Sequence, residues 1–105
     1  IIGVEHDNAI LRGMRAQGWP IDVERFGFRS DNDLAQLAAI RAGLGIGFCQ
    51  IGLAARDRDL VRVLPDTVAV ALDTWVVAHE DLRGVARIRA TFDHLVVGLR
   101  AYISA

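Results

Sequence analysis

The apolar positions of the chain switch repeatedly between helical spacing and strand-like alternation. Apolar residues three or four positions apart predict helices, whereas alternation and short uncharged runs predict strands. Gly18-Trp19-Pro20 and Pro65 interrupt these patterns, because proline cannot continue a helix or a sheet ladder. The elements predicted up to residue 64 are, in order, a strand at 1–4, a helix at 7–17, a strand at 21–28, a helix at 31–42, a strand at 44–49, a short helix at 50–55 and a strand at 60–64.

This order of elements predicts an α/β fold with a mainly parallel sheet and flanking helices. The helix at 31–42 has the clearest start, since Ser30 can cap it and Asp33 lies three residues later. Three glycines follow that helix, at 43, 45 and 47, and invite comparison with a dinucleotide-binding loop. In such a loop the glycines follow a strand and open a helix, which is the reverse order. A helix cap and close strand packing are therefore the expected roles of these glycines.

The pattern changes after Pro65. A β-branched stretch at 68–79 is interrupted by Asp73 and Thr74, and an amphipathic helix of about 20 residues follows at 84–103. We therefore expect two parts, residues 1–72 and residues 73–105. An exposed apolar stripe on a long helix is an association site, so Phe92, Leu95 and Leu99 are expected to be buried against the chain's own sheet or a second copy.

Composition narrows the function classes. The chain has 105 residues, 52% of them hydrophobic, and all twelve basic residues are arginine, which with thirteen acids give a net charge of −1. Such a balance does not favour DNA binding by this segment, because phosphate recognition needs clustered positive charge. No apolar run is long enough to cross a membrane, and the one cysteine is typical of a reducing compartment. We expect a cytoplasmic protein, and the first residue, Ile1, indicates part of a longer one.

The residues best placed for ligand chemistry are Phe28, Arg29, Ser30, Asp31 and Asn32, where a predicted strand runs into a helix. Ligands of open α/β sheets bind at such ends, where backbone N–H groups and a capping hydroxyl are available. Cys49 could pair with a histidine as a nucleophile, but no local signature supports this, and an inert thiol is the expected state. His79-Glu80-Asp81 and Asp57-Arg58-Asp59 are expected to be polar surface turns. No cofactor, metal site or catalytic residue is predicted.

Three segments resemble the second half of the effector-binding region of LysR-type transcriptional regulators. They are FRSDNDLAQLAAIRAGLGIGFCQIGLA, DLVRVLPD and LDTWVVAHEDLRGVARIRATFDHL, and together they span essentially the whole chain. The most specific parts are AIRAGLGIGF and WVVAHEDLR. The family usually has proline where this chain has Gln50.

The resemblance implies one subdomain of a periplasmic-binding-protein-like fold, with a small-molecule effector in the cleft between two subdomains. The long helix would pack on the other subdomain, and residues 7–28 would face a second subunit in a dimer or tetramer. DNA would be bound only through an N-terminal helix-turn-helix outside this chain. Carried over by position, effector contacts fall on Phe28, Arg29, Ser30, Asp31, Asn32, Phe48, Cys49 and Gln50, with Asp73 and Thr74 as hinge residues.

A second function class stays open at this point. A half-domain of a solute-binding transport receptor, or of an enzyme on the same architecture, would have a similar order of elements. The free cysteine and the WVVAHEDLR segment favour the regulator, which turns nothing over. The charge of the effector is undecided, because helix N–H groups suit an anion whereas Asp31 opposes one.

Overall fold

The structure is a computed structural model that describes residues 1–104. The chain forms two compact units, Ile1–Val70 and a second unit that begins at Ala71. The sequence patterns place a border between residues 72 and 73. Each unit is described by itself.

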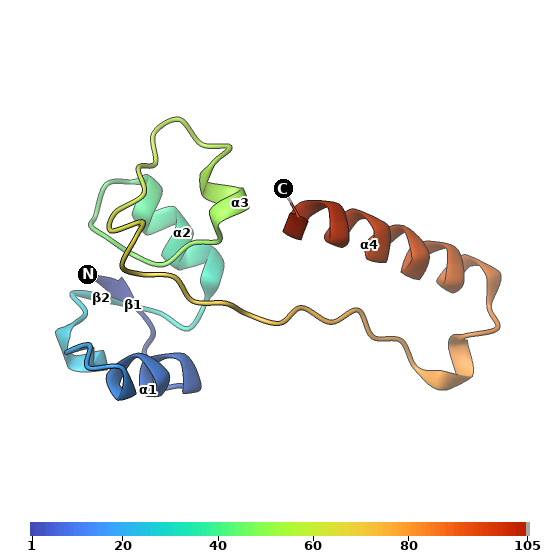
Figure 1. Cartoon of the computed structure of the whole chain (residues 1–105), viewed down its shortest axis with the longest axis horizontal. Helices are drawn as coiled ribbons and strands as arrows, with labels where there is room; N and C mark the ends of the chain where they lie inside the picture. Colours follow the sequence, from blue (N-terminus) through green and yellow to red (C-terminus); the bar gives the residue numbers. More distant parts are fainter. Residues whose placement is uncertain (105) are drawn as a thin grey trace. The chain divides into compact units, whose positions relative to one another are not determined.

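A two-stranded parallel sheet lies at the centre of the first unit (Figure 1). Its strands are β1 (Ile2–Gly3) and β2 (Phe28–Arg29), with Ile2 opposite Phe28 and Gly3 opposite Arg29. The connection between them contains the helix α1 (Ala9–Ala16) and the 3₁₀ helix η1 (Val23–Arg25). The chain thus makes the crossover that two parallel strands require.

Helix α1 begins two residues after, and ends one residue before, the bounds of 7–17 that the sequence predicts. The Asn8 side chain accepts a hydrogen bond from the Leu11 N–H at 3.0 Å, which caps the first turn. At the other end Gly18 has a φ of +92°. This conformation lets the Trp19 N–H reach the Met14 carbonyl at 3.1 Å and the Gly18 N–H reach that of Arg15 at 3.0 Å. The pair of bonds forms a Schellman motif, and the predicted stop at Gly18-Trp19-Pro20 is confirmed.

Helix α2 (Asp33–Arg41) is shorter than predicted by about two residues at its start. Its N-cap is Asn32, not Ser30 as predicted. The Asn32 side chain accepts from the Leu34 and Ala35 N–H groups at 3.0 and 3.2 Å, whereas the Ser30 hydroxyl accepts from the Asn32 N–H at 3.1 Å. Both side chains belong to the residue types that cap helices, so the sequence alone did not separate them.

The C-terminal end of α2 confirms the predicted helix cap at Gly43. Gly43 has a φ of +77° and donates its N–H to the Ile40 carbonyl at 3.0 Å, and Leu44 donates to that of Ala39 at 3.1 Å. Gly47 lies so close to Ile40 that an added Cβ would be 2.8 Å from its Cδ1 atom. Gly43 therefore caps the helix as expected, and Gly47 allows a close approach to α2, although the segment that carries it is not the strand that was predicted.

The longer strands predicted after β1 are wrong. Residues 23–25 form the 3₁₀ helix η1, because the Asp22 side chain caps it at the Val23 N–H, leaving only Phe28–Arg29 to pair. Segment 44–49 makes one ladder-like bond, from the Ile2 N–H to the Ile46 carbonyl at 2.7 Å. Segment 60–64 is irregular. A strand exists only through its neighbour, and residues 1–104 offer these segments no continuous partner. The larger sheet of a periplasmic-binding-protein-like fold stays a prediction.

The core of the first unit is small. Its buried apolar residues come from β1, from both longer helices and from the segment before β2: they are Ile2, Leu11, Met14, Phe26 and Ala39. In Figure 1, α1 lies below the strands and α2 above them. The short helix α3 (Ile51–Ala54) follows Gln50. Asp57, which comes after α3 in the chain, forms an ion pair with Arg41 of α2, with 2.9 Å between Nε and Oδ2.

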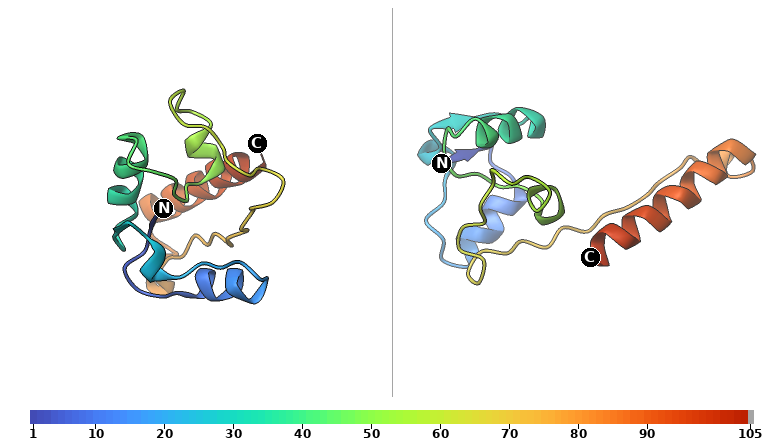
Figure 2. Two further views of the ribbon diagram at one scale, coloured as in Figure 1. Left: turned by 90° about the vertical axis from the view of Figure 1, so that its left-hand side faces the viewer. Right: turned by 90° about the horizontal axis from the view of Figure 1, so that it is seen from above.

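The second unit consists of an extended segment, the 3₁₀ helix η2 (Glu80–Leu82) and the long helix α4 (Ala86–Ser104). Within this unit α4 runs back alongside the extended segment (Figures 1 and 2). The β-branched stretch at 68–79 forms no strand among residues 1–104, since it has no ladder partner there. Leu95 is 46% exposed and Phe92 and Leu99 are half-buried, so the second unit by itself covers the apolar stripe of α4 only in part, and burial against the sheet or a second copy stays a prediction.

Candidate functional site

The carboxyl ends of β1 and β2 lie at one edge of the sheet because the strands are parallel. Beyond the paired residues, the Ser30 N–H donates to the Gly3 carbonyl at 3.0 Å, so the two chain segments stay side by side as they leave the sheet. Residues 4–6 follow β1 and residues 30–32 follow β2. This edge is where open α/β sheets bind ligands.

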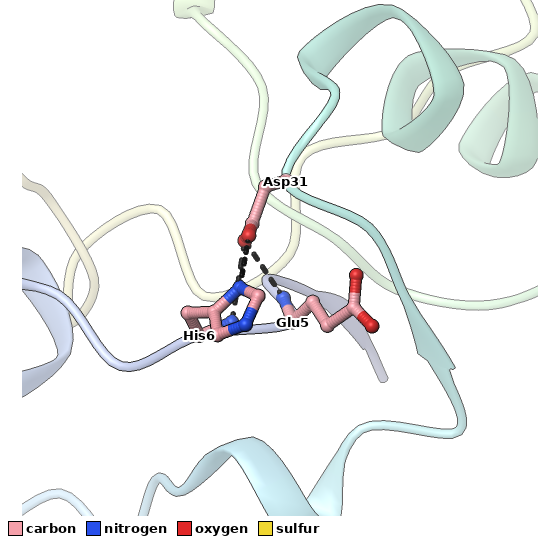
Figure 3. A group of neighbouring side chains, drawn as sticks. All are labelled: Glu5, His6 and Asp31. Carbon is pink, nitrogen blue, oxygen red and sulfur yellow. Dashed lines mark hydrogen bonds and ion pairs between the residues drawn. The ribbon is translucent and has the colours of Figure 1, made fainter.

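Asp31 joins the two segments. Its Oδ1 atom accepts hydrogen bonds from the backbone N–H groups of Glu5 at 2.9 Å and His6 at 3.3 Å. Its Oδ2 atom lies 2.5 Å from Nδ1 of the His6 ring (Figure 3). One carboxylate therefore fixes both the backbone of residues 5–6 and the orientation of the imidazole.

The pairing shifts the acidity of both side chains. The hydrogen bond with Asp31, and then the charge of that carboxylate, raise the pKa of His6 above its ordinary value of 6.5. The hydrogen bonds from the His6 ring and from the Glu5 N–H lower the pKa of Asp31 below 3.8. Both side chains are open to solvent, with exposed fractions of 79% for His6 and 48% for Asp31. The site therefore presents a paired imidazole and carboxylate that a ligand can reach.

The start of α2 supplies fewer free donors than the sequence indicated. The Asn32 side chain accepts hydrogen bonds from the N–H groups of Leu34 and Ala35. The Asn32 backbone carbonyl accepts a third, from the Gln36 N–H, at 3.1 Å. Among residues 1–104 only the Asp33 N–H of this first turn has no described acceptor. The buried Gln36 side chain donates to the Ser30 carbonyl at 2.5 Å and holds the loop against the helix. A carboxylate ligand would find few unengaged N–H groups here.

The remaining predicted contact residues lie on two separate segments. Phe28 and Arg29 form β2 and are exposed. Phe48 is 41% exposed, and the half-buried Cys49 donates its thiol to the Gln50 carbonyl at 3.5 Å. Gln50 is the N-cap residue of α3. The bond between Ile2 and Ile46 places segment 44–47 beside β1, so residues 48–50 leave the sheet region from that flank.

The predicted hinge residues Asp73 and Thr74 belong to the second unit. Thr74 contributes to a hollow of about 190 Å³ formed by the extended segment and α4. The turn at 79–81 is exposed, with the Asp81 N–H donating to His79 Nδ1 at 3.2 Å, as expected of a solvated turn.

Sequence reasoning missed Glu5 and His6. A signal was present, since both residues directly follow the first predicted strand, just as residues 30–32 follow the second. This signal assigns Glu5 and His6 to the site only when the two strands are known to be parallel neighbours. Glu5, His6 and Asp31 each bring one possible metal-ligand atom to within 4.8 Å of the others, so this group can hold a cation.

None of the helices in residues 1–104 has the length and apolarity needed to cross a membrane. Comparison with known proteins identifies no relative: no protein-family model matches the chain, and neither does any curated protein or solved structure.

Proposed function

We propose that the chain is the effector-sensing part of a LysR-type transcriptional regulator. It binds a small molecule at the carboxyl edge of β1 and β2 and thereby controls DNA binding by a longer, cytoplasmic protein. The chain turns nothing over, and the DNA-binding helix-turn-helix lies outside it. The proposal rests on the motifs that resemble the family and on the geometry of the site.

One observation carries the structural side of the proposal. The parallel pairing of Ile2 with Phe28 brings the loops after both strands to one edge, where Ser30, Asp31 and His6 present hydroxyl, carboxylate and imidazole groups. A small number of placed polar groups fixes the orientation of a bound small molecule, and these three side chains supply such groups. An effector then acts by favouring one arrangement of paired subunits.

The proposed pairing of subunits uses the surface of residues 7–28. Within it Ile10 is 38% exposed, whereas Met14 is 6% exposed and belongs to the core. A test of the dimer should therefore change Ile10 and leave Met14 intact. We expect Ile10→Asp to convert the dimer to a monomer in sedimentation equilibrium. Val61→Asp, which places the same charge on an exposed apolar position outside residues 7–28, serves as the matched control and should leave the dimer intact.

The central experiment is an effector response in the full-length protein. A panel of small organic acids and amides is tested with a transcriptional reporter and by thermal shift, using the wild type, Ser30→Ala and Ser104→Ala. Ser104 lies in α4, where its hydroxyl donates to the Arg100 carbonyl, so its change controls for loss of a serine hydroxyl away from the site. The proposal expects a compound whose effect is lost in Ser30→Ala and kept in Ser104→Ala.

Two results would contradict the proposal. A signal peptide and no helix-turn-helix in the preceding coding sequence would point to a transport receptor. A compound whose effect is equal in wild type and Ser30→Ala would place recognition away from this edge.

A further inference from the structure

We propose that Glu5, His6 and Asp31 form a binding site for a divalent transition-metal ion of the zinc type. The proposal does not depend on the regulator function, because it concerns side chains that this chain itself brings together. It adds a ligand class that the sequence patterns did not predict.

The donor set fits such an ion. Zinc is bound by imidazole nitrogen and by carboxylate oxygen at about 2.0–2.2 Å, and three protein ligands leave a fourth position for water or another molecule. Magnesium and calcium prefer oxygen ligands alone, so the imidazole of His6 favours a transition metal over both. Two carboxylates and one imidazole carry enough negative charge to compensate the ion.

The spacing of the ligand atoms is close to what the ion needs. Ligand atoms of tetrahedral zinc lie about 3.3 Å from one another, which follows from the bond lengths above. In this chain the three atoms lie within 4.8 Å of each other, and the His6–Asp31 contact is 2.5 Å. Small side-chain rotations bring Glu5 inward and separate His6 from Asp31, and the exposure of all three side chains leaves room for them.

The fold fixes two of the ligands before any ion arrives. The bonds from the Glu5 and His6 N–H groups hold Asp31 on one side, and the ring of His6 already faces that carboxylate. The Glu5 carboxylate has no described hydrogen bond or ion pair, although its charge acts on His6, and in Figure 3 no dashed line reaches it. Glu5 is thus free to close the site. The carboxylate of Asp31, held by two backbone N–H groups, lowers the entropic cost of binding, whereas the His6 ring exchanges its hydrogen bond with Asp31 for the ion.

The test is titration of the 105-residue chain with Zn²⁺ by isothermal calorimetry. We expect one ion per chain, and a loss of affinity of at least about tenfold in each of Glu5→Gln, His6→Asn and Asp31→Asn. Asp31→Asn keeps an oxygen that can accept the two backbone bonds, and Glu5→Gln breaks no described contact, so at least these variants should keep the fold. Circular dichroism of the ion-free variants checks that.

Two matched controls locate the ion. His79→Asn removes another exposed histidine that faces a carboxylate, with 3.5 Å between His79 Nδ1 and Asp81 Oδ2. This variant should bind Zn²⁺ as the wild type does. Cys49→Ser removes the thiol and should also bind normally, and Co²⁺ in place of Zn²⁺ should give a spectrum without a thiolate charge-transfer band. The proposal is overturned by absence of saturable binding, by unchanged affinity in His6→Asn or Glu5→Gln, or by loss of binding in either control.

Discussion

The ring of Phe26 occupies the space over Gly3 that a Cβ atom would need. Both residues are buried, and Gly3 is the last residue of β1. The aromatic ring can therefore approach the strand only because position 3 has no side chain. This contact packs the residue before Gly27 and β2 against the end of β1.

Gly3→Ala should lower the free energy of unfolding by about 1–3 kcal/mol, the usual cost of inserting a methyl group into a filled interior. Gly13→Ala is the matched control. Gly13 lies within α1 with nothing near the added methyl group, so this change should stabilise the chain by about 0.5–1 kcal/mol. Urea unfolding measures both, and equal effects of the same sign would contradict the packing described.

The caps of α2 give a second prediction. Asn32→Ala should cost about 1 kcal/mol of stability, since two N–H groups of the first turn lose their acceptor. Ser30→Ala should cost less, because its hydroxyl accepts a single bond in the preceding loop. Thermal unfolding measures the stability of both variants. A larger loss of stability in Ser30→Ala than in Asn32→Ala would show that Ser30 is the cap.

The buried amide of Gln36 anchors the loop that carries Asp31. Gln36→Ala removes the donor to the Ser30 carbonyl and leaves that group without its partner, so a loss of about 1–3 kcal/mol is expected. Gln17→Ala, at an exposed position, should change stability by less than about 0.5 kcal/mol. Chemical denaturation distinguishes the two, and a neutral Gln36→Ala would show that the bond is dispensable.

The His6–Asp31 pair predicts a pH dependence. The pKa of His6 is raised, so its contribution to stability is full below about 6.5 and is lost as the pH rises through its pKa in the folded chain. The pKa of Asp31 is lowered, so its contribution is present above 3.8 and is lost as the pH falls through its folded-state pKa. NMR titration of the His6 ring should give a pKa above 6.5 that returns toward 6.5 in Asp31→Asn. A value at or below 6.5 in the wild type would exclude the pairing.

A similar pair ties α1 to the loop before it. The Arg15 guanidinium donates to the Asp7 carboxylate at 2.6 Å and lowers the pKa of Asp7 below 3.8. Its contribution is present above 3.8 and disappears as the pH falls through the folded-state pKa, so Asp7→Asn should flatten the acid side of the stability profile. Urea midpoints measured between about pH 2 and 6 test this, and parallel profiles for variant and wild type would contradict it.

Helices were predictable from the sequence because their signals are local. Spacing, Asn8, Gly18 and Gly43 all act within a few residues of the turn that they begin or end, and α1, α2 and α4 form close to where these signals place them. The choice between Ser30 and Asn32 as the cap was not predictable, since each has the right chemistry and only the direction in which the chain enters the helix separates them.

Pairing of distant segments was decided by the tertiary structure. Alternation at 21–28 and 68–79 indicates where a strand could form, but its hydrogen bonds come from another part of the chain, and only Phe28–Arg29 among these residues finds such a partner. The composition of the candidate site likewise depends on segments that are distant in the sequence. Asp31 could be singled out from its own neighbours in sequence, whereas Glu5 and His6 join it only because β1 and β2 are parallel and end at one edge, which no local pattern specifies.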